Sequence, residues 1–363
     1  MRSPRITLVL AALALLCATS GFAADRQFTF AVKKGDGLDV RIHEGSIMVH
    51  TWDKDEVSVR IHSLDDDRLT DVTAVQSGGK ILVEDRGDGD LSVVVRVPGT
   101  FDLTLNTGAG DIGVKGSVKG DIEAATGGGD VMIGKTTGRV SLETAGGDIG
   151  TDEVTGDVLS HTAGGGVTIK RVTGGADIST AGGDIILGSI GEKLRASTAG
   201  GEVRIESTGG DCEVTTAGGN IAVGSGSGRI VLQSAGGDIE LRTGKGNANI
   251  NTAGGNITIH SMQGAVRAQS SAGDVSVMLD PAPGGSSTMS TGAGDVTLTV
   301  ASGAKATITA RCPDLSGHGE EGPIQSDFPV VRVKGGNVEI QVNGGGHKIM
   351  LETMIGEISI KKK

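Results

Sequence analysis

The stretch Thr144-Ala-Gly-Gly-Asp-Ile149 decides the fold, because the chain repeats it at a fixed interval. It returns unchanged at Thr180–Ile185, and variants of it begin every 18 residues from Thr126 to Ser270. Two more copies lie outside the regular series, one 19 residues before it and one 21 residues after it, and begin at Thr107 and Thr291. A fixed period of this kind indicates a stack of equivalent structural units.

Aligned at this period, the chain shows apolar columns that alternate with polar ones. Two apolar columns in the first half of each coil lie two residues apart, which is the period of a β-strand. The first comprises Val140, Val158, Ala176, Leu194, Cys212, Ile230, Ala248 and Val266. A further column follows the Gly-Gly turn and comprises Ile149, Val167, Ile185, Val203, Ile221, Ile239, Ile257 and Val275. Each coil is therefore expected to hold two strands and two tight turns.

These columns predict an all-β fold, a right-handed parallel β-solenoid (β-helix) with 18-residue coils. One coil cannot bury its apolar face alone, but a stack of coils can. Crossovers between parallel strands are right-handed as a rule, which gives the expected hand. Residues 28–100 alternate without the Gly-Gly signature, and they predict a β-rich N-terminal cap.

The chain is expected to divide into four segments. Residues 1–23 combine arginines, an apolar run and small residues in the order of a signal peptide, with Gly21 and Ala23 before the cleavage point. Residues 24–100 are the N-terminal β cap and residues 101–300 the solenoid. Residues 301–363 are expected to be irregular as far as Pro329 and then to form closing strands. The mature protein is predicted to be exported to the periplasm, the extracellular space or the cell surface, without insertion into a membrane.

Composition narrows the possible partners. The formal net charge is −11, so the chain repels phosphate backbones, and nucleic acid is not an expected partner. Aromatic residues make up 2% of the chain, and none lies between Phe101 and Phe328. The expected solenoid therefore offers no aromatic platform on which an enzyme could hold a sugar ring.

The residue after the Gly-Gly pair is acidic or an amide in most coils. The acidic members are Asp130, Asp148, Asp184, Glu202, Asp238 and Asp274, and the amide members are Asn220 and Asn256. Carboxylates stacked along one edge repel each other, and a divalent cation such as calcium could relieve that repulsion. The competing interpretation is that Asp and Asn suit tight turns, where they bond their own backbone. The turn interpretation is favoured. No cofactor is therefore expected, and calcium is the alternative.

A hydroxyl column, from Thr144 to Ser270 at the same period, lies in phase with the apolar columns. It is expected to point inward at the corner and to bond the turn backbone. The alternative is a flat outward array of hydroxyl groups such as ice-binding solenoids use.

Three other features have structural interpretations. Gly108-Ala-Gly-Asp-Ile-Gly113 matches the dinucleotide pattern, but a strand rather than a helix is expected after it. Cys212 falls in an apolar column, and Cys312 is too many coils away for a disulfide unless the tail folds back. His161 and His260 fall in different columns, so no catalytic residues are predicted.

The chain resembles the bacterial DUF4097 group, described as adhesin-like proteins with β-strand repeats. The matching stretches are Gly45-Ser-Ile-Met-Val, Trp52-Asp-Lys-Asp-Glu-Val, Val97-Pro98, Phe101-Asp-Leu-Thr-Leu, Gly344-Gly-Gly-His-Lys-Ile and Ile355-Gly-Glu-Ile-Ser-Ile. The resemblance implies a right-handed β-helix and supplies no catalytic or binding residues. Met354-Ile-Gly-Glu departs from the Asn-Gly-Asp that is more usual there, which affects the local turn.

The function expected from these features is a non-catalytic, adhesin-like binding protein or envelope scaffold. Its partner would be an unidentified protein or glycan at the cell envelope. Two alternatives stay open, a β-helix enzyme acting on polysaccharide and a calcium-stabilised repeat protein.

Overall fold

The computed structural model describes residues 24–363 except 64–66, 88, 314–322 and 335–336. The predicted signal peptide, residues 1–23, lies outside the described residues. The chain divides into two compact units, Met1–Gly156 and Asp157–Lys363. Both units consist of β-strands. Within the described residues there is also one short 3-10 helix, Asp67–Thr70. In the described part of the chain, no helix has the length and apolarity of a membrane span.

The first unit begins with seven strands that form its terminal cap. They are β1 (Ala24–Ala31), β2 (Gly37–Ile42), β3 (Glu44–Trp52), β4 (Glu56–Ser63), β5 (Val72–Ser77), β6 (Lys80–Asp85) and β7 (Asp90–Pro98). The coils that follow are β8 (Asp102–Thr107) with β9 (Ile112–Lys119), β10 (Ile122–Thr126) with β11 (Val131–Thr137), and β12 (Val140–Thr144) with β13 (Ile149–Thr155). Equivalent strands pair in parallel at the 18-residue offset, as Ile122 with Val140 and Val131 with Ile149.

The order of stacking in this cap differs from the order along the chain. Strand β2 lies between β6 and β8 and pairs in parallel with both, while β3 lies between β7 and β9. Antiparallel strands then close the end, since β5 pairs with β6, β4 with β7, and β1 with β4. The 19-residue step of the sequence is absorbed where β9 meets β11, as a register shift between Ile133 and Lys135.

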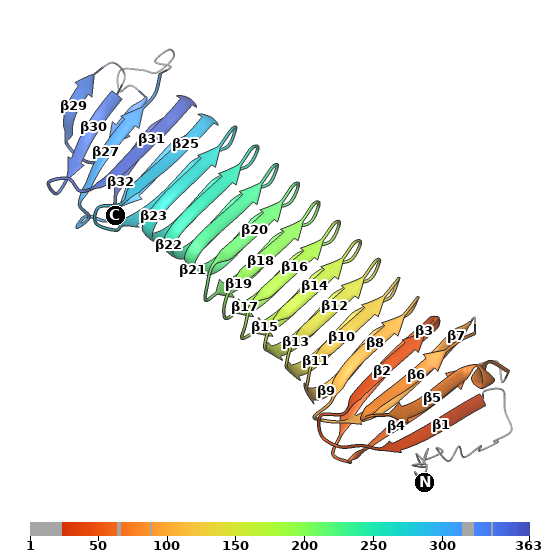
Figure 1. Cartoon of the computed structure of the whole chain (residues 1–363). Helices are drawn as coiled ribbons and strands as arrows, with labels where there is room; N and C mark the ends of the chain where they lie inside the picture. Colours follow the sequence, from red (N-terminus) through yellow and green to blue (C-terminus); the bar gives the residue numbers. More distant parts are fainter. Residues whose placement is uncertain (1–23, 64–66, 88, 314–322, 335–336) are drawn as a thin grey trace, which may run out of the picture. The chain divides into compact units, whose positions relative to one another are not determined.

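The second unit is also built of two-strand coils. Its coils contain β14 (Val158–Thr162), β15 (Val167–Val172), β16 (Ala176–Thr180), β17 (Ile185–Ile190), β18 (Leu194–Thr198), β19 (Val203–Thr208) and β20 (Cys212–Thr216). Three longer strands follow, β21 (Ile221–Ser234), β22 (Ile239–Thr252) and β23 (Ile257–Ser270), and these run through the second corner without a break. Gly228, Gly246 and Gly264 make that bend at φ +78°, +115° and +134°. The neighbouring strands lie side by side in Figure 1.

At the C-terminal end of the second unit, as in the N-terminal cap, one coil lies between two coils that are not its neighbours along the chain. The strands are β24 (Val275–Pro281), β25 (Ser286–Ala293), β26 (Val296–Val300), β27 (Ala306–Arg311), β28 (Ile324–Ser326), β29 (Val330–Lys334), β30 (Asn337–Val342), β31 (His347–Ile355) and β32 (Ile358–Lys362). Strand β31 pairs in parallel with β25 and β27, and β32 pairs with β26 and β28. Antiparallel β30 and β29 then close this end.

The prediction that residues 301–329 are irregular is wrong for β27 and for the short strand β28, which pairs with β32. In β27 the residues Ala306, Ile308 and Ala310 alternate with polar ones, and all three are fully buried. The small side chains made this alternation inconspicuous, but packing against β31 and β30 on either side fixes it as a strand.

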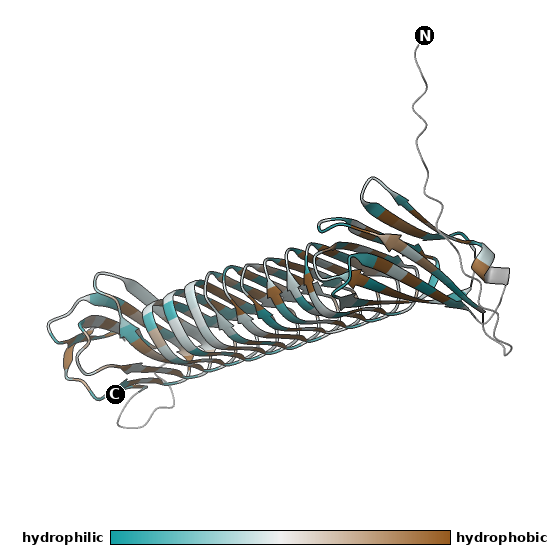
Figure 2. Ribbon diagram, turned by 90° about the horizontal axis from the view of Figure 1, so that it is seen from below, coloured by the Kyte–Doolittle hydropathy of each residue, from teal (hydrophilic) through white to brown (hydrophobic). Residues whose placement is uncertain are grey.

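The interior of each unit is made of the predicted columns. Hydrophobic and hydrophilic residues alternate along the strands in Figure 2. The buried residues are mainly aliphatic. Leu194, Cys212 and Ile230 are each at most 1% exposed, as are Ile185, Val203 and Ile221. Fully burying a side chain of this size stabilises the fold by roughly 1.5–3 kcal/mol. The predicted parallel β-solenoid with 18-residue coils is confirmed.

The second glycine of each Gly-Gly pair lies where adjacent coils approach most closely. A Cβ atom added to Gly237 would lie 2.1 Å from the carbonyl oxygen of Gly219, and one added to Gly201 would lie 2.0 Å from that of Gly183. Real side chains never occupy such positions, so this column is restricted to glycine by stacking rather than by φ. The first glycine of the pair is less constrained, since a Cβ on Gly236 would meet its nearest atom at 3.6 Å.

We therefore expect Gly237→Ala and Gly236→Ala to differ strongly although they are neighbours in one turn. Gly237→Ala should destabilise the protein by about 2 kcal/mol or more, because the coils must separate to admit the methyl group. Gly236→Ala should change stability by less than about 0.5 kcal/mol. Urea unfolding of both variants beside the parent chain measures the difference. Equal losses would show that stacking does not select glycine at this corner.

A charged cluster on the first unit gives a second prediction. Asp39 has a side chain that is 3% exposed and is held by the Arg41 guanidinium at 2.8 Å and by Lys80 Nζ at 2.9 Å. Burial alone would raise the pKa of Asp39, but hydrogen bonds and charge attraction from Arg41 and Lys80 outweigh it and hold the pKa below its ordinary value.

The contribution of Asp39 should therefore depend on pH. A carboxyl group whose pKa is lowered by folding stabilises the folded state above its unfolded pKa, and this stabilisation is lost as pH falls through the folded value. Asp39→Asn should lower the melting temperature at neutral pH, and the deficit should shrink below about pH 4. Glu213→Gln, which opens the exposed pair with Arg195, is the matched control and should change little at either pH. A deficit independent of pH would contradict this account.

Candidate functional site

The hydroxyl column points inward at the Gly-Gly corner, as predicted. Thr252 is 6% exposed; its Oγ1 donates to the carbonyl of Gly237 at 2.9 Å and accepts the N–H of Gly255 at 3.2 Å. The same pair of bonds recurs at Thr144, Thr180, Thr198, Thr216, Ser234 and Ser270. Each hydroxyl thus ties its own turn to the turn of the coil before it, and the column is not an outward array.

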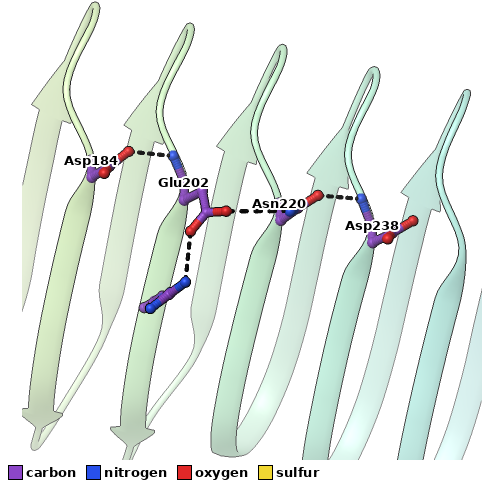
Figure 3. A network of polar contacts seen from close by, with 5 residues as sticks. Asp184, Glu202, Asn220 and Asp238 are labelled. Carbon is purple, nitrogen blue, oxygen red and sulfur yellow. Dashed lines mark hydrogen bonds and ion pairs between the residues drawn. The ribbon is translucent and has the colours of Figure 1, made fainter.

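The acidic and amide column forms a ladder along the outside of the same corner. Asp184 Oδ1 accepts the backbone N–H of Glu202 at 2.8 Å, and Asn220 Oδ1 accepts that of Asp238 at 2.8 Å, as Figure 3 shows. Asp238 continues the ladder to Asn256 at 2.7 Å. Further rungs join Asp130 to Asp148 in the first unit, and Asn256 to Asp274 and Asp274 to Asp295 in the second. Each side chain therefore satisfies a backbone donor in the next coil.

Glu202 interrupts this ladder because its side chain is one carbon longer. Its two carboxylate oxygens contact Arg204 at 2.9 Å and the side-chain amide of Asn220 at 3.3 Å (Figure 3). The backbone N–H of Asn220 consequently has no protein acceptor within the described residues. The exception shows that the ladder needs a carboxyl or amide group at the length of Asp or Asn.

The ladder shows that the acidic column stabilises the turns by accepting backbone hydrogen bonds. Calcium binding by this column stays a hypothesis. Asparagine replaces aspartate in the column without loss of the bond, which a site built on carboxylate charge would not tolerate as readily. Within the described residues, no three His, Cys, Asp or Glu side chains gather as metal ligands would.

A second ladder at the other corner was not predicted. Asp121 Oδ1 accepts the N–H of Arg139 at 2.8 Å in the first unit, and Asp157 and Asp211 each accept a backbone N–H at 2.9 Å in the second. Its sequence signal is a Gly-Asp pair at multiples of 18 residues, but several coils have another residue there. The irregular column hid the pattern.

The remaining predicted features have structural roles. Strand β9 follows Gly108, which excludes the helix that a dinucleotide site requires. Cys212 and Cys312 are both buried, and neither is joined in a disulfide. Burial raises the pKa of the Cys212 thiol to about 12, although a hydrogen bond with the hydroxyl of Thr208 partly offsets this effect. His161 contacts Ser179 at 2.7 Å, and His260 contacts Glu240 at 3.0 Å, so these two histidines belong to separate contacts.

His347 is a buried histidine that the sequence did not single out. Its Nδ1–H donates to the carbonyl of Ala282 at 2.7 Å, and its Nε2 accepts the hydroxyl of Ser287 at 2.8 Å. Ser287 Oγ in turn accepts the N–H of Val266 at 3.0 Å. The serine is 2% exposed, and the ring is oriented by a carbonyl rather than a carboxylate. This arrangement fastens β31 to the loop before β25 and does not resemble an activated nucleophile.

Asp238 offers a test that separates the turn role of the acidic column from cation binding. Asp238→Ala removes the acceptor of the Asn256 N–H and should cost about 1 kcal/mol. Asp238→Asn keeps Oδ1 and should lie within about 0.5 kcal/mol of the parent chain. For each of the three proteins, the melting temperature in millimolar calcium should equal its melting temperature in chelator. A calcium-dependent rise that Asp238→Asn abolishes would establish a cation site instead.

The fold and its corner ladders define a protein of the parallel β-solenoid class. The Toastrack DUF4097 family model matches residues 30–300, and the chain belongs to this family. Among proteins of curated function, no match is found.

Solved structures of low sequence identity are also similar to the chain. One from Parabacteroides distasonis, described as a "putative lipid binding protein", is 13% identical, with a TM-score of 0.32 over 77% of this chain and 97% of its own. A "putative adhesin" from Bacteroides fragilis is 12% identical, with a TM-score of 0.22 over 94% of this chain and 97% of its own. A "putative adhesin" from Parabacteroides distasonis is also 12% identical, with a TM-score of 0.25 over 77% and 98%.

Proposed function

We propose that the protein is an exported, non-catalytic β-solenoid that binds a partner at the cell envelope or serves there as a scaffold. One observation carries the proposal. The repeated polar groups, which are the hydroxyl column and the Asp/Asn ladder, are already bonded to turn backbone. The outward side chains of the strands are therefore the groups that each coil can offer to a partner. Together they form a surface suited to binding.

The competing function is a β-helix enzyme that acts on polysaccharide. The second unit has an open groove that would suit a polymer, lined by residues of β15, β17, β19, β21 and β22. Its carboxylates are Glu206 and Glu240, and Glu240 is held by His260 at 3.0 Å. Glycosidases pair a carboxylate with a carboxylic acid of raised pKa. The Glu240 side chain is 45% exposed, whereas a catalytic carboxylic acid of raised pKa lies in a buried, apolar surrounding.

The proposal is tested by locating the protein and measuring what it does there. The full chain, expressed in a double-membrane bacterium, should be found outside the cytoplasm by fractionation, with protease access to intact cells separating periplasm from surface. A control with Leu10→Arg and Leu13→Arg, which breaks the apolar run of residues 6–16, should stay in the cytoplasm. Purified protein should bind washed envelopes saturably.

Two results would contradict the proposal. One is turnover of any glycan in a panel of envelope polysaccharides, followed by reducing-end release. The other is cytoplasmic retention of the full chain together with the absence of saturable binding to envelopes.

A further inference from the structure

The outward residues of four neighbouring strands in the second unit form a flat, amide-rich surface. We call it the amide face and define it as Gln233, Asn249, Asn251, Arg267, Gln269 and Ser290, from β21, β22, β23 and β25. We infer that the amide face binds a neutral, hydroxyl-rich glycan laid across the coils. This inference rests on the proposed binding function and names its ligand class.

Asparagine is placed here against its own conformational preference. In β22 the residues Asn249 and Asn251 alternate with buried Ala248 and Ile250, so both point outward from the strand. Asparagine is depleted in strands, where threonine and valine are favoured. A position that breaks a local rule without a stabilising gain is where a functional role is expected. Neither of these two asparagines lies in the column of either corner ladder.

The amide face is held in a fixed arrangement by its own hydrogen bonds. Asn251 Nδ2 donates to Asn249 Oδ1 at 3.2 Å, and Arg267 Nε donates to Gln269 Oε1 at 3.2 Å. Gln269 Nε2 donates to Ser290 Oγ at 3.3 Å. Within the described residues, Asn251 Oδ1 and Asn249 Nδ2 have no protein partner, so this pair of amides offers one acceptor and one donor. Sugar hydroxyls and acetamido groups require both.

Charge argues for a neutral ligand. The same outward columns in the preceding coils contain Asp177, Arg195 and Glu213, of which the last two form an ion pair at 3.1 Å. The six residues of the amide face are four amides, one serine and one cation, Arg267, and the nearest carboxylate along the stack is Glu352, which pairs with Ser290. The single guanidinium and the carboxylate at the edge offset each other, so the surface offers an acidic polymer no net positive charge.

The geometry favours a polymer over a small sugar. Register pairing places Gln233 beside Asn251, Asn251 beside Gln269, and Gln269 beside Ser290, at the strand spacing of about 4.8 Å. Two shallow grooves flank the amide face. One is lined by Asn251, Gln269 and Ser290, and the other by Asn247, Arg267 and Thr288. A chain of sugars along the stack would therefore meet a polar side chain at each coil.

The test uses a double variant that should fold at least as well as the parent. Asn249→Thr with Asn251→Thr removes both amides and introduces the residue that strands prefer. The control, Ser261→Thr with Ser276→Thr, makes the same kind of change at outward positions of β23 and β24 away from the amide face. The probes are neutral glucan oligosaccharides, N-acetylglucosamine oligosaccharides and polygalacturonate, titrated calorimetrically into the protein from residue 24 onward.

We expect saturable binding of at least one neutral probe, weakened about tenfold or more in the Asn249/Asn251 variant and unchanged in the control. The melting temperature of the variant should equal or exceed that of the parent. Equal affinity of variant and parent would overturn the inference, as would salt-dependent binding of polygalacturonate alone. If no neutral probe binds while the protein still binds washed envelopes, the inference fails and the proposed function stands.

Discussion

The structure depends on how closely the coil backbones approach at the Gly-Gly corner. A Cβ atom on the second glycine would lie about 2 Å from a carbonyl oxygen of the preceding coil, as at Gly201 and Gly237. This contact fixes glycine in every coil and brings backbone donors and acceptors of adjacent turns together. Those groups must be satisfied in so tight a space. A threonine or serine hydroxyl does this from inside the corner, and an aspartate or asparagine oxygen does it from outside.

This constraint also decides where function can lie. The interior of each unit is filled by aliphatic columns, and the repeated polar groups are bound to turns. The buried side chains that are reactive in other proteins have structural roles here. Cys212 packs in an apolar column, and His347 fastens β31. Outward strand residues are free of these duties and vary from coil to coil. Asn249 and Asn251 of β22 stand out there, since neither the corner nor the core requires them.

The 18-residue period, the inward columns and the role of the hydroxyl column could be predicted because each depends on contacts between equivalent residues of successive coils. The order of strands in the caps could not, because alternation identifies a strand without naming its partner. Strand β31 lies between β25 and β27, which precede it by tens of residues. The Ser287–His347 contact joins residues 60 positions apart, and the 18-residue repeat does not predict it. The amide face was missed because outward columns have no uniform composition.

Hydrogen exchange at the corner tests most directly whether the Asp/Asn ladder joins successive coils. The backbone amides of Asp238, Asn256 and Asp274 each donate to a side chain of the preceding coil, whereas that of Asn220 faces Glu202 and lacks this bond. Residue-resolved exchange should therefore show the first three amides protected like strand amides and the amide of Asn220 exchanging at the rate of an open turn. Four amides that exchange at one common rate would contradict the ladder.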